Sequence, residues 1–373
     1  MSGSLGLYLH IPFCVQKCAY CAFYSLPGQG AGRQRDYVRA LEEQLRRWAP
    51  RCRGRRVDTV YLGGGTPSYL GGPALAGLLS WVRRLFAVEE GAEITVECNP
   101  ESVTPELLTA LRRAGANRLS LGVQSLSDER LRTLGRAHDA AGARAAYRLA
   151  RRAGFDNISV DLMYGLPGQG LEDWRREVEG ILSWRPEHLS AYALTVEAGT
   201  PMARLPEDLF LDEDAQADQY ELLCRLAAGA GYRHYEISNF ALPGRHSRHN
   251  SRYWDLSEYL GLGPGAHSYL DGRRFFFEAD LAAFLTGACP PRQEEQGPFH
   301  RGDEYVMLML RTQRGVEEGE FARRFGRPFT PYAQRLRPFL PLGLAAEEGG
   351  RWRLTERGFL VSNAILTEVL DGE

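Results

Sequence analysis

Lysine is almost absent from this sequence: Lys17 is the single lysine among 45 basic residues, and the others are arginines. No lysine follows a glycine-rich loop, so the chain has no Walker A nucleotide site, and a Schiff-base lysine would have to be Lys17 itself. Long apolar runs are missing too, since no stretch reaches the roughly 18 apolar residues of a membrane span. The first residues show no charged segment followed by an apolar one, so we expect a cytoplasmic protein.

An excess of charge of either sign is also lacking. The formal net charge is -2 over 373 residues, which gives no reason to expect a nucleic acid as partner. The length suits one large and one small domain. Seven cysteines, an odd number without an export signal, argue for reduced thiols rather than disulfides. Four of them are scattered, and we interpret them as small buried apolar residues or incidental thiols: Cys52, Cys98, Cys224 and Cys289.

Short apolar runs alternate with helical patterns over the first two thirds of the chain, which is typical of βα units around a parallel sheet. Tyr37, Leu41 and Leu45 recur at helical spacing, and Thr104 before Pro105 is typical of a helix N-cap. The predicted strands are 5–11, 58–62, 93–98, 118–122, 157–163 and 188–193. Six units are too few for a closed eight-stranded barrel. We therefore expect an α/β fold with a partial (βα)6 TIM-like barrel.

The remainder of the chain predicts a separate small domain. Residues 232–285 suggest a further strand and aromatic loops, and the Pro-, Gln- and Glu-rich run 290–298 predicts a linker. After it we expect helices at 304–312 and 317–325, a strand at 351–354, a turn at 355–358 and a helix at 359–370. This order predicts a winged-helix-like tail, which is favoured as a packing or docking module over DNA binding because no basic stripe is confined to it. The predicted domains are 1–289 and 298–373.

Three thiols follow the first predicted strand within eight residues: Cys14, Cys18 and Cys21. A structural zinc site needs four ligands in pairs, and neither a second pair of cysteines nor a nearby pair of histidines completes one here. Thiolates are the usual ligands of iron–sulfur clusters, and a cubane of four irons held by three cysteines leaves one iron open. We therefore predict a 4Fe–4S cluster, with zinc and an incidental trio as the alternatives.

The run from Tyr8 to Cys21 resembles the opening of radical S-adenosylmethionine (radical SAM) enzymes of the oxygen-independent coproporphyrinogen oxidase family. It reads Tyr-Leu-His-Ile-Pro-Phe-Cys-Val-Gln-Lys-Cys-Ala-Tyr-Cys, and the resemblance extends over nearly the whole chain. It implies that the amino and carboxylate groups of S-adenosylmethionine chelate the fourth iron. It also implies that an electron from the reduced cluster cleaves the sulfonium C–S bond.

Further polar and glycine positions suit this cofactor. Glycines in Gly63-Gly-Gly-Thr66 permit a close approach of the backbone to a ligand, although such a turn is as often only a tight turn. Glu97, Gln124 and Asp161 stand at the carboxyl ends of later strands, which meet at one mouth in a parallel barrel. The resemblance implies contacts with S-adenosylmethionine, including a carboxylate contact of the arginine, for Tyr8, Gly64, Gly65, Thr66, Glu97, Gln124, Arg136 and Asp161.

Two features separate the groups within this family. The oxidase carries a fourth cysteine two residues after the third, where this chain has Phe23. The HemW heme chaperones share the three-cysteine form and a segment His-Asn-x-x-Tyr-Trp, which is here His249 to Trp254. This resemblance implies a 4Fe–4S cluster, S-adenosylmethionine and heme as cofactors. It also implies delivery of heme to apoproteins, with membrane-associated respiratory proteins among them, which would bring the cytoplasmic chain to the membrane surface.

His249 is the candidate heme ligand, because neutral imidazole coordinates heme iron and the adjacent Tyr253 and Trp254 suit a porphyrin face. A histidine among aromatic residues is more often structural, which is how we interpret His10 and His267, and only the resemblance makes the ligand role of His249 equally plausible. The main alternative function is an oxygen-independent coproporphyrinogen III oxidase, followed by a radical enzyme with an unrelated substrate. The sequence leaves open whether the chain is an enzyme that cleaves S-adenosylmethionine, and whether it forms a homodimer.

Overall fold

The computed structural model describes residues 4–294 and 301–370, which form two compact units. The first unit holds the described residues up to Leu211 together with Ser257–Glu294, and the second holds the others. The segment from Asp212 to Leu256 therefore groups with the C-terminal residues. The domain boundaries predicted from the sequence, 1–289 and 298–373, stay a prediction. Residues 295–298 of the predicted linker lie outside the described residues.

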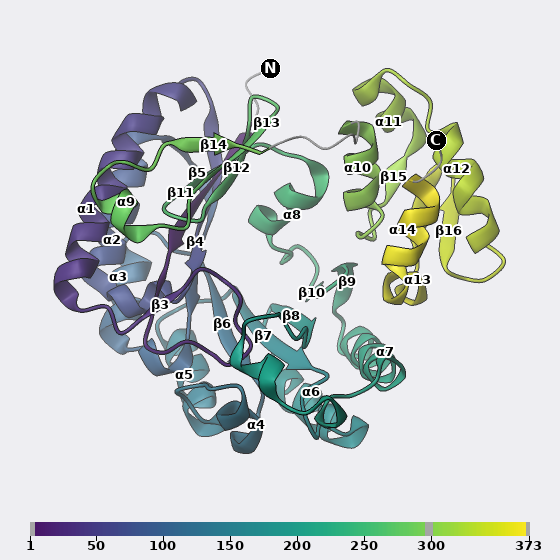
Figure 1. Ribbon diagram of the computed structural model, residues 1–373, viewed down its shortest axis with the longest axis horizontal. Helices are drawn as coiled ribbons and strands as arrows, with labels where there is room; N and C mark the ends of the chain where they lie inside the picture. The colour runs from purple at the N-terminus through teal and green to yellow at the C-terminus, as the bar shows by residue number, and fades with distance from the viewer. Residues whose placement is uncertain (1–3, 295–300, 371–373) are drawn as a thin grey trace. The chain divides into compact units, whose positions relative to one another are not determined.

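Parallel strands form the centre of the first unit (Figure 1). They are β1 (Ser4–Ile11), β4 (Arg56–Gly64), β5 (Ala87–Cys98), β6 (Arg118–Gln124), β7 (Ile158–Tyr164) and β8 (His188–Ala193). Each pairs in parallel with the next, so all six predicted strands are confirmed. The second neighbour of β1 is β11 rather than β8. The six strands consequently form an open partial barrel, as predicted.

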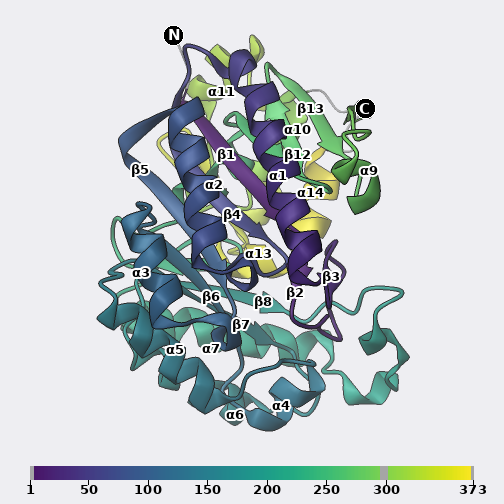
Figure 2. The same ribbon diagram turned by 90° about the vertical axis from the view of Figure 1, so that its left-hand side faces the viewer.

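Helices connect these strands and cover one face of the sheet; Figure 2 shows α1 and α2 in front of β1 and β4. They are α1 (Ala31–Trp48), α2 (Gly72–Leu85), α3 (Pro105–Arg113), α4 (Asp128–Thr133), α5 (Ala140–Arg152) and α6 (Leu171–Leu182). Helix α1 buries the predicted apolar stripe of Tyr37, Leu41 and Leu45. The predicted N-cap is confirmed, because the Thr104 hydroxyl accepts a hydrogen bond from the Leu107 N–H at 3.2 Å.

An extension widens the sheet beyond β1. Strand β11 (Tyr259–Leu262) is parallel to β1, whereas β12 (His267–Leu270), β13 (Arg273–Phe277) and β14 (Pro291–Gln293) follow antiparallel, with α9 (Leu281–Leu285) before the last. The expectation of one further strand in 232–285 was wrong, and so was the linker over 291–293. These strands are three to five residues long and have weak local patterns. The pairing of β11 with the sequence-distant β1 anchors them, and each later strand pairs with the one before it. The first cysteine ends β2 (Phe13–Cys14), which pairs with β3 (Leu26–Pro27).

The second unit combines two segments of the chain. Its first elements are α7 (Glu213–Gly229), β9 (Arg233–Glu236), β10 (Asn239–Ala241) and α8 (Arg248–Asp255). Its later elements are α10 (Arg301–Met309), β15 (Val316–Glu317), α11 (Glu318–Phe325), α12 (Thr330–Leu336), β16 (Ala345–Glu348), β17 (Arg351–Leu354), α13 (Glu356–Leu360) and α14 (Ser362–Leu370). Helices precede a β-hairpin in the three-stranded sheet β15-β17-β16, which agrees with a winged-helix-like tail.

Two details of the tail differ from expectation. The turn predicted at 355–358 is wrong, because Thr355 caps a helix: its hydroxyl accepts a hydrogen bond from the Gly358 N–H at 3.1 Å. The helix predicted at 359–370 is divided between α13 and α14. Among residues 4–294 and 301–370, no helix has the length and apolar character needed to cross a membrane.

Candidate functional site

Five neighbouring strands of the first unit each carry a predicted site residue that keeps solvent access beside buried neighbours. Gln124 and Asp161 are the one accessible residue of β6 and of β7. Tyr8 has buried neighbours on both sides in β1, as does Glu97 in β5, and Gly64 ends β4. Parallel β sheets are otherwise covered on both faces. The accessible positions therefore mark a polar, solvent-reached face of the sheet.

Two backbone hydrogen bonds hold the loop with the three cysteines, one beside the end of β1 and one to the end of α4. The Leu26 N–H donates to the Pro12 carbonyl at 2.6 Å, and the Ala19 N–H donates to the Leu134 carbonyl at 2.9 Å. Burial raises the pKa of Cys14, and the neighbouring thiols Cys18 and Cys21 raise it further. A thiol in such surroundings favours the thiolate when a bound metal supplies positive charge.

The predicted glycine turn packs directly against the cysteine loop. A Cβ on Gly65 would lie 2.8 Å from the Phe13 carbonyl oxygen and 3.0 Å from the Cys14 sulfur. Gly64 has a φ of 114°, and a Cβ there would lie 2.6 Å from the ring of His10. The Thr66 hydroxyl donates to the Cys14 sulfur at 3.4 Å. The two glycines thus allow the turn to pack closely against His10 and the cysteine loop. Their contact with a ligand stays a prediction.

Arg136 joins the cysteine loop to the strand ends. Its Nη1 donates to the Cys18 sulfur at 3.4 Å, and its Nη2 donates to Asn99 Oδ1 and to the Gly122 carbonyl, both at 2.8 Å. Asn99 Nδ2 donates in turn to the Thr66 hydroxyl at 2.9 Å. The buried Nε of Arg136 has no hydrogen-bond partner among the described residues. Asn99 was not assigned from the sequence, although its place two residues after Glu97 was a usable signal.

The two predicted carboxylates are partly buried and lie in hydrogen-bonded surroundings. Glu97 accepts from the Tyr61 hydroxyl at 2.7 Å and from the Gly64 N–H at 3.0 Å. Burial raises its pKa to about 7, and Asp161 contributes to the rise. Asp161 accepts from the Ser120 hydroxyl at 3.1 Å, and burial raises its pKa as well. Both groups suit hydrogen bonds to hydroxyls of a ligand. No sequence pattern marked Tyr61 or Ser120 as partners of these carboxylates.

These residues fit an iron–sulfur cluster with an attached cofactor. One loop supplies three sulfur donors, and a guanidinium beside them supplies positive charge together with one buried donor that the protein leaves unused. Tyr8 lies on the same face, since its ring is 6.1 Å from that of Tyr61 between centroids. The hydroxyl of Tyr8 is also 2.9 Å from Nδ1 of His10, whose predicted structural role agrees with its burial under Gly64.

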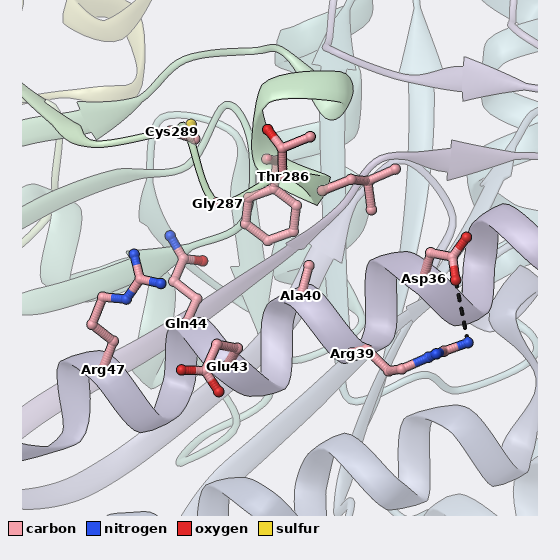
Figure 3. A pocket seen from close by; sticks show the side chains of 11 residues that line it. Asp36, Arg39, Ala40, Glu43, Gln44, Arg47, Thr286, Gly287 and Cys289 are labelled. Atoms are coloured by element: carbon pink, nitrogen blue, oxygen red, sulfur yellow. Dashed lines mark ion pairs between the residues drawn. The ribbon is translucent and has the colours of Figure 1, made fainter.

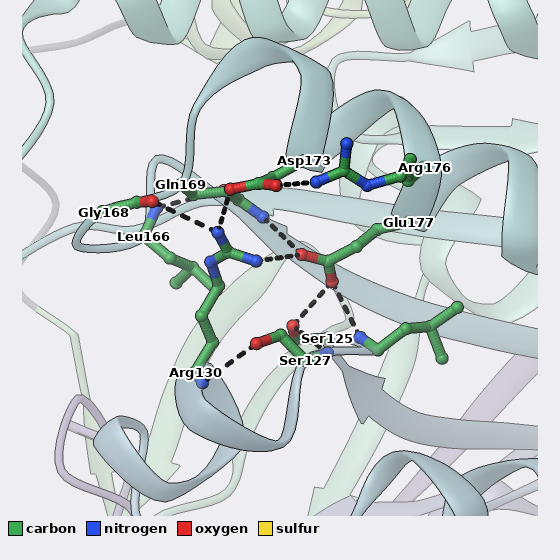
Figure 4. Close-up of polar contacts among 10 residues, drawn as sticks. Ser125, Ser127, Arg130, Leu166, Gly168, Gln169, Asp173, Arg176 and Glu177 are labelled. Carbon is green, nitrogen blue, oxygen red and sulfur yellow. Dashed lines mark hydrogen bonds and ion pairs between the residues drawn. The ribbon is translucent and has the colours of Figure 1, made fainter.

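A buried polar network holds the two loops that follow β6 and β7 (Figure 4). Glu177 of α6 accepts from the Ser125 hydroxyl at 2.6 Å and from the Leu126 N–H at 2.7 Å. Its other oxygen accepts from Arg130 at 3.1 Å and from Gln169 at 3.2 Å. Gln124, at a φ of 68°, directly precedes this network. The network therefore fixes the backbone around a predicted cofactor contact, and the sequence did not reveal it.

His249, the predicted heme ligand, belongs to the second unit. It lies in α8, its side chain is fully buried, and its Nε2 is 3.1 Å from the hydroxyl of Tyr253. The two rings meet edge to face at 5.6 Å between centroids. His267 is exposed and pairs with Glu294 at 2.5 Å, which is compatible with a structural role. Ligation of heme by His249 stays a prediction.

A groove of about 520 Å³ lies between α1 and α9 (Figure 3). Gln44 and Arg47 of α1 line it on one side, and Thr286 and Cys289 line it on the other. None of the predicted cluster or cofactor residues lines this groove. It is thus separate from the site described above.

Comparison with known proteins identifies the family. The model of the radical SAM superfamily matches residues 8–179, and that of the HemN C-terminal domain matches residues 299–361. The heme chaperone HemW of Mycobacterium tuberculosis is 39% identical over 98% of this chain and 94% of the relative. That of Escherichia coli is 37% identical over 97% of each. The chain belongs to the HemW family. This confirms the predicted membership of the radical SAM superfamily.

A solved structure supports the fold of this HemW-family chain. The coproporphyrinogen III oxidase HemN from Escherichia coli, described as a radical SAM enzyme, matches with a TM-score of 0.87 over 99% of this chain and 90% of that chain. The two sequences are 22% identical, so the likeness concerns the fold alone. The predicted arrangement of a radical SAM core with a C-terminal domain is confirmed.

Proposed function

We propose that this chain is a heme chaperone, which holds a 4Fe–4S cluster and S-adenosylmethionine, binds heme and delivers it to heme-requiring apoproteins. The observation that carries the proposal is 37–39% identity over nearly the full length to two proteins named heme chaperones. A second observation supports the proposal: where the oxidase has its fourth cysteine, this chain has Phe23, which is 72% exposed.

Cys14, Cys18 and Cys21 are the proposed ligands of the cluster. When bound, the cluster supplies an open iron for the amino and carboxylate groups of S-adenosylmethionine and an electron for its cleavage. Arg136 would offset negative charge beside the Cys18 sulfur and offer its unused Nε to the cofactor. The carboxylates of Glu97 and Asp161 would accept hydrogen bonds from hydroxyl groups of the ligand. The proposed S-adenosylmethionine contacts are Tyr8, Gly64, Gly65, Thr66, Glu97, Gln124, Arg136 and Asp161.

His249 is the proposed axial ligand of heme. Its Nε2 is engaged by the Tyr253 hydroxyl, so ligation requires this contact to break and the buried ring to become accessible. We propose a cytoplasmic protein that reaches the membrane surface when it transfers heme to membrane-associated respiratory apoproteins. Light scattering on the purified protein would decide between a monomer and a homodimer.

The test is a heme titration of anaerobically reconstituted protein, followed in the Soret region. We expect saturable binding and a changed spectrum in His249→Ala, because an axial nitrogen is lost. His267→Ala is the matched control, since this histidine is exposed, and its spectrum should equal that of the unaltered protein. Absence of saturable binding would refute the chaperone proposal, and an unchanged His249→Ala spectrum would refute the ligand.

Coproporphyrinogen III oxidase is the second candidate, favoured by the fold shared with the oxidase from Escherichia coli. The two candidates predict opposite results when reduced protein is incubated with S-adenosylmethionine and coproporphyrinogen. A chaperone leaves the substrate intact, whereas an oxidase forms stoichiometric protoporphyrinogen. The second result would replace our proposal.

A further inference from the structure

Three side chains of the second unit bring a sulfur, a nitrogen and an oxygen together outside the site described above. Cys224 comes from α7, His234 from β9 and Glu356 from the start of α13. One potential ligand atom of each lies within 4.8 Å of the other two. His234 Nδ1 is 4.0 Å from the Cys224 sulfur and 3.7 Å from Glu356 Oε1. These three types of side chain are the usual protein ligands of zinc.

The imidazole of His234 is oriented from its far side. Its Nε2 is 3.3 Å from the Tyr220 hydroxyl, which donates its own proton to the Ile237 carbonyl at 3.2 Å. With that proton on the Ile237 carbonyl, the hydroxyl oxygen is free to accept from Nε2–H, and in this tautomer the Nδ1 lone pair faces Cys224 and Glu356. Histidine ligands of metals are oriented in this way by a partner on the other ring nitrogen.

Packing holds the same ring in place. Phe240 stacks on His234 at 4.3 Å between ring centroids, and Phe359 meets it edge to face at 5.3 Å. The His234 side chain is only 5% exposed, whereas that of Glu356 is 51% exposed. The imidazole is thus rigid and the thiol is buried, while the carboxylate side is open to solvent and can adjust. The alternative to a metal site is a simple ion pair between His234 and Glu356. In that case the Cys224 thiol would contribute only a weak hydrogen bond to His234.

We propose that Cys224, His234 and Glu356 bind one Zn²⁺ ion, with the fourth position open to water. Zinc bonds of about 2.0–2.3 Å in a tetrahedron place ligand atoms roughly 3.3–3.7 Å apart. The three atoms therefore need to approach by about 1 Å or less, a movement available to the half-exposed Glu356 side chain. Binding forms the Zn–S bond as the thiol releases its proton to solvent. Two anionic ligands then neutralise the ion.

The ion would link distant parts of the chain. Cys224 and His234 precede the strands β11 to β14 of the first unit, and Glu356 follows them in the C-terminal residues. Zinc would thus fasten α7 and β9 to α13 within the second unit. This role is independent of heme binding, and its test does not depend on the proposed function.

The test measures metal content and affinity in the full-length chain with Cys14, Cys18 and Cys21 replaced by alanine, so that zinc cannot occupy the cluster loop. We expect one zinc per chain by mass spectrometry after dialysis. Added Co²⁺ should give the absorption of a cobalt–thiolate bond. Cys224→Ser should abolish that absorption, and the matched control Cys52→Ser, a buried thiol of the first unit, should retain it.

Two further variants sharpen the assignment. Tyr220→Phe removes the partner of Nε2 and should weaken zinc about 10–100-fold, the usual effect of losing such a contact. Glu356→Gln changes a half-exposed side chain, so its folding is secure even if Cys224→Ser fails to fold, and it should weaken zinc at least as much. No saturable zinc or cobalt binding, or equal affinity in folded Glu356→Gln, would overturn the proposal.

Discussion

The predicted cofactor residues of the first unit and the predicted heme ligand of the second differ in their access to solvent. Tyr8, Glu97 and Asp161 keep an accessible surface in otherwise buried strands, whereas His249 is fully buried and engaged by Tyr253. The first arrangement leaves the predicted contact residues within reach of solvent. Heme ligation in the second requires a change of conformation, for which part of the binding free energy is used.

Removal of the three cluster thiols gives the largest expected effect. Cys14, Cys18 and Cys21 replaced together by alanine should abolish the iron–sulfur absorption of reconstituted protein, because the cluster loses its sulfur ligands. The control Cys98→Ala removes a buried thiol and should keep the absorption. Heme affinity, measured by titration, should change less than about twofold, well under 1 kcal/mol. Loss of heme binding together with the cluster would contradict the view that the two units bind their cofactors independently.

Glu177→Gln tests how firmly the first site is preformed. The change weakens the pairing of a buried carboxylate with Arg130, which should cost about 3 kcal/mol of unfolding free energy, the lower end for such pairs because Asp173 still contacts Arg130. Glu172→Gln is the control, since Glu172 is 69% exposed in its pair with Arg175, and should cost less than about 0.5 kcal/mol. Equal urea midpoints for the two variants would contradict the account.

The raised pKa of Glu97 predicts a pH dependence of stability. A carboxyl whose folded pKa is about 7 stabilises the fold fully below its ordinary value of 4.5, and this stabilisation is lost as the pH rises from 4.5 to 7. Glu97→Gln should remove this loss, so that the free energy of unfolding of the variant exceeds that of the unaltered protein by up to about 3 kcal/mol at the upper end of the interval. Thermal unfolding of protein without cluster measures it. Glu90→Gln, exposed on the same strand, should follow the unaltered protein.

Gly65→Ala probes the contact of the glycine turn with the cysteine loop. The added methyl group would meet the Phe13 carbonyl at 2.8 Å and Cys14 at 3.0 Å, and overpacking of this kind costs about 1–3 kcal/mol. We expect lower cluster occupancy by iron and sulfide analysis. Gly91→Ala is the matched control, because nothing lies within 4 Å of its Cβ position. Full cluster occupancy in Gly65→Ala would show that the turn and the cysteine loop have room for the added methyl group.

The smallest effect concerns the second unit. Tyr253→Phe removes the hydroxyl that engages His249 Nε2, a hydrogen bond of about 0.5–1.5 kcal/mol. Heme binding should therefore become tighter by roughly 2- to 12-fold if that bond must break before ligation. Unchanged or weaker binding would mean that Tyr253 does not oppose ligation.

Local patterns predicted the parallel core because each strand is a compact apolar run bounded by helical spacing. All six predicted strands lie within or close to the observed ones. The extension β11 to β14 was missed because its strands are short and its first strand depends on a distant partner, since Tyr259 of β11 pairs with Gly6 of β1. Pro291 and Gln293 even looked like linker residues, and only the pairing with β13 makes them a strand.

The site shows the same limit. Cysteine spacing and strand ends identified the loop and the polar face, but not the residues that hold them in place. Asn99 and Glu177 act through contacts with Thr66, Arg136 and Ser125, which lie 33 to 52 residues away and depend on the tertiary structure. The burial of His249 was equally invisible, because a helical segment with polar and aromatic residues gives no sign of which face is covered.

The central claim is a 4Fe–4S cluster held by Cys14, Cys18 and Cys21 with one iron open to S-adenosylmethionine. Electron paramagnetic resonance of the reconstituted, reduced protein tests it most directly. We expect a signal of a reduced 4Fe–4S cluster that changes on addition of S-adenosylmethionine and is absent when the three cysteines are replaced by alanine. A signal that ignores S-adenosylmethionine, or one that survives the replacement, would contradict it.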